Sequence, residues 1–452
     1  MNQHENIFIN SGMRDQASAA ILQSKNIQTL GAAIGYLLSE EFECSCAILI
    51  AIDTRPSGNR IKNDLIAGLQ KFGHDIFDAG IAPTPFVAKA LKDYEAEDED
   101  NGENAEDSFF TLGIVITASH NPAEYNGIKI LTPFGYLDID TELEISNIFH
   151  QFLQNPKLIE ESLPDETGSV IDFDLKSWYQ SEILDVIEKI PKKISIVLDC
   201  VNGATAQIAP QIFQACGYRV TAINNTLDGD KINSSTLQNL IQAIQKHDLD
   251  WGVAFDGDGD RMIMVNRQGT IFDGDDILSI LSKSQNYQDQ KTLVGTIMTN
   301  TAIQNYLTQQ NKKLIRTPVG ERNLIEALVQ QQAYLGAETC GHIIMMDHAF
   351  CSDGIFSALM FLQTVAEQPG LTKKSYQKYA QKHATIALAS PVNQTQLKQL
   401  SSEYEKKNAC RIIVRPSNTE PVLRIMVEHK DEQTAEKILQ DLKNELIKIL
   451  KI

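Results

Sequence analysis

The chain has 452 residues, of which 42% are hydrophobic and 22% charged, and its formal net charge is −19 at pH 7. This length predicts roughly three or four domains, and the acidic balance argues against nucleic acid or an anionic membrane as the main partner. No apolar run approaches the ~18 residues of a membrane span, and the N-terminus lacks the pattern of a secretion signal. The cysteines show no repeated metal-ligand spacing. We therefore expect a cytoplasmic protein with reduced thiols.

Strands and helices alternate along the first part of the chain, as is typical of parallel sheets covered by helices. The pattern predicts a strand at 47–52, a helix at 61–72 and a strand at 74–79. The segment 95–107 holds many carboxylates and no basic residue. We expect it to be a solvated loop that leads to the next strand.

A β-branched, apolar run at 112–116 predicts a central strand, and the chain leaves it at Ser119. Pro122 prevents simple continuation of a strand or helix. A hydroxyl at the carboxyl end of a sheet strand lies where α/β proteins bind ligands. His120 could orient or exchange a proton there, and Lys129 offers a cation. Taken alone, Ser119 fits a structural turn better than a catalytic role.

A second strand–helix unit follows the first. It predicts a strand at 194–199, a helix that runs to about Cys216 and a strand at 219–223. A third unit opens with predicted strands at 251–255 and 262–265. Because strands and helices alternate here as they do in the first part of the chain, we expect the same α/β architecture to recur.

Carboxylate and glycine alternate at Asp256, Asp258 and Asp260, directly after the strand that opens the third unit. The glycines allow a tight turn, so three carboxylates can converge on one hard cation. A calcium loop of the EF-hand type needs Gly at its sixth and Glu at its twelfth position, which are Arg261 and Arg267 here. We therefore favour Mg²⁺ completed by a phosphate over calcium. An acidic turn without a metal is disfavoured, because its carboxylates would repel one another.

Two further polar loops lie between predicted strands. Residues 336–342 contain Glu338, which can accept hydrogen bonds from sugar hydroxyls, but this loop is weak support on its own. Between strands at 411–414 and 422–428, a second loop combines a guanidinium, hydroxyls and an amide, which suits a phosphate dianion. The alternative is a hairpin turn rich in Ser and Asn. The candidate phosphate ligands are Arg415, Ser417, Asn418 and Thr419. A helix at 432–451 follows.

Together these four loops, in this order, resemble the α-D-phosphohexomutase family, which isomerises hexose 1-phosphates and 6-phosphates. The resemblance covers nearly the whole chain and includes Asp53-Thr54-Arg55 and the segment 82–85. It implies an α/β fold of three related mixed domains with largely parallel sheets plus a smaller α+β C-terminal domain, in a heart-shaped molecule with a central cleft. The implied domains are 1–155, 156–255, 256–370 and 371–452.

The resemblance also implies a mechanism and its residues. Ser119 would be carried as phosphoserine, and one Mg²⁺ would be held by it with Asp256, Asp258 and Asp260. A phosphoserine carries about −1.5 to −2 charges, which the ion neutralises as the phosphoryl group leaves. The sugar would pass through a hexosamine 1,6-bisphosphate. The implied cations and proton-transfer groups are Arg14, His120, Lys129 and Arg261, with acid and base left open, and the implied sugar ligands are Glu338, Cys340 and His342.

The segment 319–322 resembles the amino-sugar branch of the family, in which an acid follows the glycine. We hypothesise that Glu321 pairs with the 2-ammonium group of the substrate. The alternatives are a glucose or mannose phosphate mutase and a sugar-phosphate-binding homologue with little turnover. The protein would act on a small sugar phosphate as a monomer or homodimer.

Departures from the family pattern motivate the binding-homologue alternative. The N-terminal loop keeps Gly12 and Arg14 but lacks their usual neighbours. Cys340 stands where the family has a serine, and a thiol is the weaker hydrogen-bond partner. Asn418 stands where the amino-sugar branch usually has glycine, although Asn tolerates left-handed backbone conformations.

Overall fold

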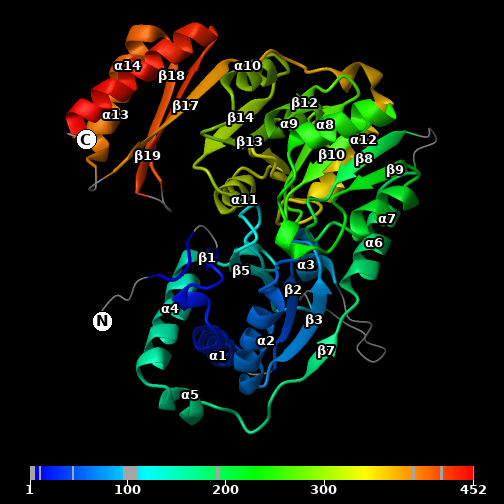
Figure 1. Ribbon diagram of the computed structural model, residues 1–452, viewed down its shortest axis with the longest axis vertical. Helices are drawn as coiled ribbons and strands as arrows, with labels where there is room; N and C mark the ends of the chain where they lie inside the picture. Colours follow the sequence, from blue (N-terminus) through cyan, green and yellow to red (C-terminus); the bar gives the residue numbers. More distant parts are fainter. Residues whose placement is uncertain are drawn as a thin grey trace.

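The computed structural model of the protein describes residues 6–9, 12–42, 45–94, 109–189, 194–388, 392–417 and 421–450. Within these ranges the strands form sheets of 7, 5, 4 and 3 strands, which follow one another along the chain (Figure 1). We call the parts built on these sheets the first to fourth units. The acidic segment 95–107 lies outside the described residues.

The first sheet has the strand order β1-β5-β4-β2-β3-β7, with β6 paired to β5. Its parallel strands are β2 (Ala47–Ile52), β3 (Asp75–Ile81), β4 (Leu112–Ile116) and β7 (Val170–Asp172), and its antiparallel strands are β1 (Met13–Gln16), β5 (Tyr125–Thr132) and β6 (Gly135–Tyr136). Its helices are α1 (Ser24–Glu41), α2 (Gly58–Leu69), α3 (Thr84–Asp93), α4 (Ile139–Gln154) and α5 (Lys157–Glu161).

Strand β2 is buried on both faces because helices cover both sides of this sheet. Ile48, Ile50 and Ile52 join a core with residues of α1, α2 and α4. Leu49 and Ala51 point to the other face and join residues of α3. This alternation is what a period of two residues dictates in a strand. The predicted strand at 47–52 is confirmed, whereas the predicted helix at 61–72 begins earlier, at Gly58, and its last turn is a 3-10 helix, η2 (Gln70–Phe72).

The second sheet has the order β12-β11-β10-β8-β9. Its parallel strands are β8 (Ser195–Asp199), β9 (Arg219–Ile223) and β10 (Trp251–Phe255), and its antiparallel strands are β11 (Met262–Asn266) and β12 (Ile271–Phe272). Its helices are α6 (Leu175–Val186), α7 (Ile208–Ala215) and α8 (Leu237–His247), with the short η3 (Gly229–Lys231). Helix α7 ends as predicted, because Gly217 adopts a φ of 95° just beyond it.

The third sheet has the order β14-β13-β15-β16. It consists of the parallel β13 (Thr292–Thr296), β14 (Lys313–Thr317) and β15 (Leu335–Ala337) and the antiparallel β16 (Ile343–Met345). Its helices are α9 (Gly274–Leu281), α10 (Thr301–Gln309), α11 (Glu321–Gln330) and α12 (Gly354–Glu367), followed by η4 (Pro369–Thr372). One apolar core continues from Leu49 in the first unit through Val253 to Leu335, so the first three units pack as one body.

The fourth unit has an apolar core of its own. Its antiparallel strands are β17 (Ala380–Ala387), β18 (Arg411–Pro416) and β19 (Val422–His429), and its helices are α13 (Gln394–Asn408) and α14 (Glu432–Leu450). It lies at one end of the molecule (Figure 1, orange and red). Arg411 joins it to the third unit by donating hydrogen bonds to the carbonyl oxygens of Ile297 at 2.7 Å and Thr299 at 2.9 Å.

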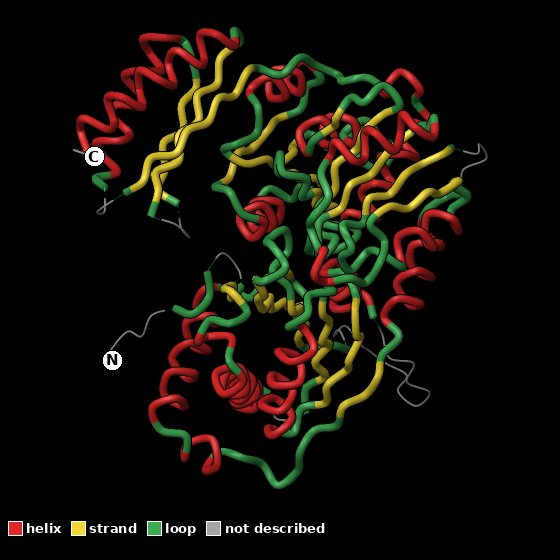
Figure 2. The backbone as a smooth tube through the Cα atoms, viewed as in Figure 1, coloured by secondary structure: helices red, strands yellow, loops and turns green. Residues whose placement is uncertain are grey.

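One structural plan recurs in the first three units. A parallel strand turns back into an antiparallel neighbour, from β4 to β5, from β10 to β11 and from β15 to β16. Three of the four predicted functional loops are these turns. We call them the serine loop (117–124), the aspartate loop (256–260) and the thiol loop (338–342). Figure 2 shows loop segments, in green, between the sheets of the first and third units. No helix among the described residues is long and apolar enough to cross a lipid bilayer.

Candidate active site

The serine loop presents Ser119 to the aspartate loop. Ser119 has a φ of 49°, a left-handed conformation that is unusual for a residue other than glycine. Its backbone N–H donates a hydrogen bond to Thr117 Oγ1 at 2.8 Å. Its hydroxyl donates a hydrogen bond to Asp256 Oδ2 at 2.8 Å. The structure therefore brings together the two segments on which the proposed chemistry depends.

Arg55 fixes the path of the serine loop, a role that the residue pattern did not predict. The side chain of Arg55 is fully buried, and its Nε lies 2.9 Å from Asp53 Oδ2, which also accepts a hydrogen bond from Thr117. The guanidinium donates hydrogen bonds to loop carbonyl oxygens, namely those of Ser119 at 2.8 Å, Asn121 at 2.7 Å, Tyr125 at 2.9 Å and Pro122. Displacing a buried guanidinium from its hydrogen-bond acceptors costs free energy, so Arg55 holds the loop rigidly.

Asn233 holds the serine loop from the second unit. Its side-chain amide donates hydrogen bonds to the carbonyl oxygens of Ser119 at 2.7 Å and Asn121 at 3.0 Å. Asn233 itself has a φ of 59°. No sequence motif marks this residue, because the contact depends on how two units pack.

The aspartate loop gathers three carboxylates around a turn. Oxygens of Asp256, Asp258 and Asp260 lie within 4.8 Å of one another. Gly259 has a φ of 76°, and this conformation makes glycine the suitable residue in the turn. Lys129 Nζ lies 2.6 Å from an oxygen of Asp258 and 2.6 Å from an oxygen of Asp260. The lysine thus partly neutralises the cluster.

The donor set fits a divalent cation. Asp258 Oδ1 is buried and has no hydrogen-bond partner among the described residues. Burial, together with repulsion from Asp260 and Asp258, raises the pKa of Asp256 to about 8, and a cation bound beside this carboxylate would favour its charged form. Carboxylate oxygens are the protein ligands that Mg²⁺ prefers. A cation among these oxygens would lie beside the Ser119 hydroxyl.

Cationic and imidazole side chains surround this centre. His120 Nδ1 lies 3.3 Å from Ser119 Oγ. Desolvation by the surrounding protein and the guanidinium groups of Arg261 and Arg14 lower the pKa of His120 to about 4, so the ring is neutral at pH 7. Arg14 lies on β1 and donates a hydrogen bond to Asn121 Oδ1 at 3.1 Å. The predicted cations therefore do gather around the serine loop.

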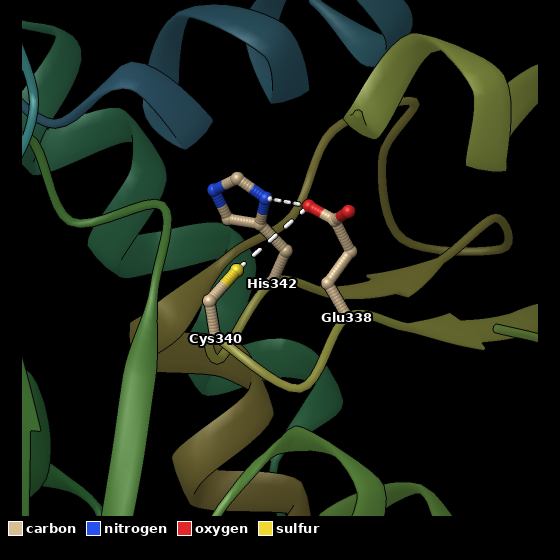
Figure 3. Close-up of side chains that lie close together, drawn as sticks. All are labelled: Glu338, Cys340 and His342. Atoms are coloured by element: carbon tan, nitrogen blue, oxygen red, sulfur yellow. Dashed lines mark hydrogen bonds and ion pairs between the residues drawn. The ribbon is translucent and has the colours of Figure 1, made fainter. Parts of the chain in front are cut away.

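The thiol loop adjoins the aspartate loop. Its three predicted ligands, Glu338, Cys340 and His342, lie close together (Figure 3). His342 Nδ1 is 2.9 Å and Cys340 Sγ is 3.8 Å from Glu338 Oε2. On the other side of the ring, His342 Nε2 lies 3.3 Å from Asp260 Oδ1 and accepts a hydrogen bond from Arg261 Nε at 2.8 Å. A sugar bound by these three residues would lie next to the proposed cation.

Glu321 is buried beside the same centre. Its carboxylate lies within 4.8 Å of ligand atoms of Asp260 and His342. It already accepts hydrogen bonds from the Tyr136 hydroxyl at 2.6 Å and the Ser352 hydroxyl at 2.7 Å, as well as from the Ser352 backbone. These partners, which the sequence did not reveal, hold the carboxylate in place. That it pairs with a substrate ammonium group stays a prediction.

The phosphate-loop residues lie on the fourth unit. Arg415 is at the end of β18, where its charge interacts with that of Glu338 across the two units. The Ser417 backbone N–H donates a hydrogen bond to the Val422 carbonyl oxygen at 2.8 Å. Asn418 and Thr419 lie outside the described residues. The structure thus brings the first three loops into contact and places Arg415 on a separate sheet.

A cavity of about 280 Å³ opens beside the three loops. Its lining on the loop side comprises His120, Asp256, Arg261 and Cys340, and its lining from the second unit includes Asp199, Asn233, Ser235 and Thr236. The cavity thus adjoins the meeting point of the serine and aspartate loops. Apolar side chains, among them Val201, Leu237 and Ile263, complete the wall, so the cavity combines apolar surface with several polar groups.

Comparison with protein families places the whole chain in one group. Residues 5–155, 176–269 and 273–385 match alpha/beta/alpha domains I, II and III of phosphoglucomutase/phosphomannomutase, in that order. Residues 380–445 match the C-terminal domain of the same group. The domain matches therefore follow the four sheets of the structure.

Full-length relatives and solved structures agree with these matches. A phosphoglucosamine mutase of Acetivibrio thermocellus is 32% identical over 451 residues, covering 95% of this chain and 96% of that protein. One from Clostridioides difficile is 33% identical over 436 residues, covering 92% and 93%. A phosphoglucomutase/phosphomannomutase family protein of Burkholderia thailandensis has a similar fold, with a TM-score of 0.80 at 22% identity, covering 99% and 98%. Aspergillus fumigatus N-acetylphosphoglucosamine mutase, solved with GlcNAc-6P and magnesium, gives 0.62 at 15% identity, covering 97% and 94%.

Proposed function

The chain belongs to the phosphoglucomutase/phosphomannomutase family, and on that premise we propose that it is a phosphoglucosamine mutase, which interconverts glucosamine 6-phosphate and glucosamine 1-phosphate. The full-length relatives of that name support the choice of substrate. The observation that carries the chemistry is the 2.8 Å hydrogen bond from Ser119 Oγ to Asp256 Oδ2. It places a phosphate-accepting hydroxyl against a cluster of carboxylates suited to a divalent cation.

Ser119 is the group that we propose carries phosphate. Its phosphoryl group passes to the free hydroxyl of the bound sugar phosphate, which becomes glucosamine 1,6-bisphosphate, and the other phosphate of that molecule then returns to Ser119. Asp256, Asp258 and Asp260 would hold Mg²⁺ together with the phosphoserine. Bound there, the ion supplies positive charge next to the phosphoryl oxygens. Arg55 and Asn233 keep the serine backbone in place during both transfers.

His120 is the better candidate for accepting the proton of the attacking hydroxyl. Its ring is neutral at pH 7 because its pKa is lowered to about 4, and its Nδ1 lies 3.3 Å from Ser119 Oγ. Burial opposes the charge on Lys129, but Asp258 and Asp260 outweigh it and raise the pKa of Lys129 above its usual value. A lysine held as a cation cannot serve as a base at neutral pH. We therefore assign Lys129 to charge balance.

The remaining predicted residues bind the sugar phosphate in this proposal. Glu338, Cys340 and His342 accept or donate hydrogen bonds to sugar hydroxyls, and Glu321 faces the 2-ammonium group. The loop with Arg415, Ser417, Asn418 and Thr419 holds the phosphate that is not reacting. The 1,6-bisphosphate, bound in one of two opposite orientations, can then present its 1-phosphate or its 6-phosphate to Ser119.

The compartment and the assembly also remain proposals. Five of the described cysteines are free thiols, which fits a reducing cytoplasm, namely Cys200, Cys216, Cys340, Cys351 and Cys410. We propose that the enzyme works there as a monomer or homodimer. Its partner in either case is the small sugar phosphate.

The test compares three substrates on the same enzyme. Coupled assays with glucosamine, glucose and mannose 6-phosphates should give the highest kcat/KM for glucosamine 6-phosphate. Intact-mass spectrometry should show one added phosphate on the active protein and none on Ser119→Ala. A phosphate that persists in Ser119→Ala, or equal turnover of all three sugars, contradicts the proposal.

A further inference from the structure

Three different donor atoms converge at one point of the thiol loop. Glu338 Oε2, His342 Nδ1 and Cys340 Sγ all lie within 4.8 Å of one another. The oxygen is 2.9 Å from the nitrogen and 3.8 Å from the sulfur. Figure 3 shows the three side chains pointing toward one another from a single turn. A tetrahedral metal ion with bonds of about 2.0–2.3 Å has neighbouring ligands roughly 3.3–3.5 Å apart, so each of these separations needs to change by only about 0.3–0.4 Å to bind one.

The turn holds these donors in place before any ligand arrives. The Glu338 backbone N–H donates a hydrogen bond to the His342 carbonyl oxygen at 2.9 Å, and the Gly341 N–H donates one to the Glu338 carbonyl oxygen at 3.0 Å. The Gly320 N–H donates to Glu338 Oε1 at 3.0 Å, which leaves Oε2 to face the cluster. Little reorganisation is therefore needed to bind an ion.

The chemistry of the set differs from that of the aspartate loop. Mg²⁺ prefers oxygen ligands alone, whereas a thiolate, an imidazole and a carboxylate together select zinc and similar transition metals. The thiol is decisive, because the serine that the family usually has in place of Cys340 is a much poorer metal ligand. Among the described cysteines, Cys340 is the exposed one, so an ion can reach it from solvent.

We propose that Glu338, Cys340 and His342 form a Zn²⁺ site whose fourth position is open to solvent. The site lies beside the aspartate loop but shares no ligand with the group Asp256, Asp258 and Asp260. An ion there occupies the atoms that we assign to the sugar hydroxyls. Zn²⁺ therefore inhibits the enzyme in competition with the sugar phosphate, a consequence that rests on the proposed function, whereas the binding itself does not.

The protons can be accounted for in this step. Zn²⁺ displaces the thiol proton of Cys340, which goes to solvent, and the single ring proton of His342 moves by exchange with solvent from Nδ1 to Nε2. The ring proton is then on His342 Nε2, which lies 3.3 Å from Asp260 Oδ1. Such a carboxylate behind a metal-binding imidazole strengthens the ligand. Arg261, which loses its acceptor at Nε2, already lies 3.8 Å from Asp256 Oδ2 and can turn to it.

Binding is tested with Co²⁺ and Zn²⁺ as probes on the full chain. Co²⁺ bound through Cys340 should give a sulfur-to-cobalt absorption band that one equivalent of Zn²⁺ removes. Cys340→Ser should lose the band and weaken Zn²⁺ binding at least about tenfold, since even partners of metal ligands affect affinity by that much. Cys410→Ser, which changes a half-buried cysteine on the fourth unit, is the matched control and should keep both.

Inhibition provides the second readout. Zn²⁺ should raise the apparent KM for the sugar phosphate in the unmodified protein and in Cys410→Ser. In Cys340→Ser, Zn²⁺ should change the KM much less, measured against the activity of the same variant without zinc. A band retained in Cys340→Ser overturns the site. Equal Zn²⁺ inhibition of all three proteins also overturns it and assigns the effect to the aspartate loop. Because the cobalt band requires no turnover, failure of the proposed mutase activity is distinguishable from failure of the site.

Discussion

The serine loop and the thiol loop are the same kind of turn, held in two different ways. Each joins a parallel strand to an antiparallel neighbour, β4 to β5 and β15 to β16. The serine loop is fixed by side chains that reach it from elsewhere, Arg55 and Asn233. The thiol loop is held mainly through backbone hydrogen bonds, both within the loop and from the N–H groups of Met262 and Gly274 to its carbonyl oxygens. The position of the Ser119 hydroxyl thus depends on distant side chains, whereas that of the thiol loop depends on backbone contacts.

This difference suits the proposed chemistry. A phosphoryl group must transfer in line, and a displacement of about 1 Å can cost roughly a hundredfold in rate. Side chains that reach in from two separate units fix Ser119 relative to both of them. The thiol loop would contact sugar hydroxyls, whose hydrogen bonds tolerate more variation in geometry.

The largest expected effect comes from removing the external support of the serine loop. Arg55→Met should lower the free energy of unfolding by about 3–5 kcal/mol, because it leaves Asp53 as a buried charge without its partner. The variant should also lose turnover, since several loop carbonyl oxygens lose their donor. Urea unfolding and mutase assays measure the two effects.

A second variant separates charge from positioning. Asp53→Asn added to Arg55→Met removes the unpaired charge, so part of the stability should return while turnover stays low. Full recovery of turnover in the double variant would mean that Arg55 only balances Asp53.

The next effect tests the backbone contacts that hold the thiol loop. Gly341 has a φ of 105°, and a Cβ there would lie 2.5 Å from the Met262 carbonyl oxygen. Gly341→Ala should therefore cost about 1–3 kcal/mol and raise KM for the sugar phosphate. Thermal unfolding and steady-state kinetics measure this. Gly370→Ala is the control, because a Cβ there meets nothing within 4 Å, and it should change neither quantity.

A smaller effect is expected from the support that the second unit gives to the serine loop. Asn233→Gly keeps the positive φ of 59° accessible but removes two donors to the loop. It should lower kcat about tenfold, equivalent to about 1.4 kcal/mol, with little change in KM. Asn224→Gly, at a φ of 46° and bonded to Asp199 instead, is the matched control. Equal kinetic losses in both variants would rule out a specific role for Asn233.

The smallest effect is a loss of stability at acidic pH, which we expect in the first unit and not in the third. His74 is buried, and its Nδ1 accepts a hydrogen bond from the Cys46 N–H at 3.2 Å. Burial lowers the pKa of His74 below its usual value of about 6.5. The unfolded chain then takes up a proton more readily, so stability is full above about pH 6.5 and falls as the pH drops below it.

Hydrogen exchange at pH 7.5 and 5.5 can locate this loss. Protection of β2 and β3 should fall in acid, and His74→Gln should flatten the dependence. In the third unit, His342 faces Glu338 at 2.9 Å, so its protonation finds a partner there. A loss of protection confined to the third unit would contradict this expectation.

Local patterns in the sequence were sufficient for much of the fold. The strands at 47–52 and 251–255 lie where predicted, because their apolar side chains are buried within sheets covered by helices. The strand at 219–223 also lies where predicted, as a partly exposed edge strand of its sheet. The alternation of Asp and Gly from Asp256 to Asp260 indicated a tight turn, and the structure has one. The start of α2 was placed too late, since the polar residues of its first turn carry no apolar period.

Only the tertiary structure decided how the site is held together. Asn233 reaches a serine loop that is 114 residues away along the chain, and Glu321 is bound by Tyr136 and Ser352 from separate segments. Contacts of a side chain with a distant backbone leave no periodic trace in the sequence, because they depend on how finished units pack against one another. The sequence by itself therefore predicted which residues would carry the proposed chemistry, and packing determined what holds them in register.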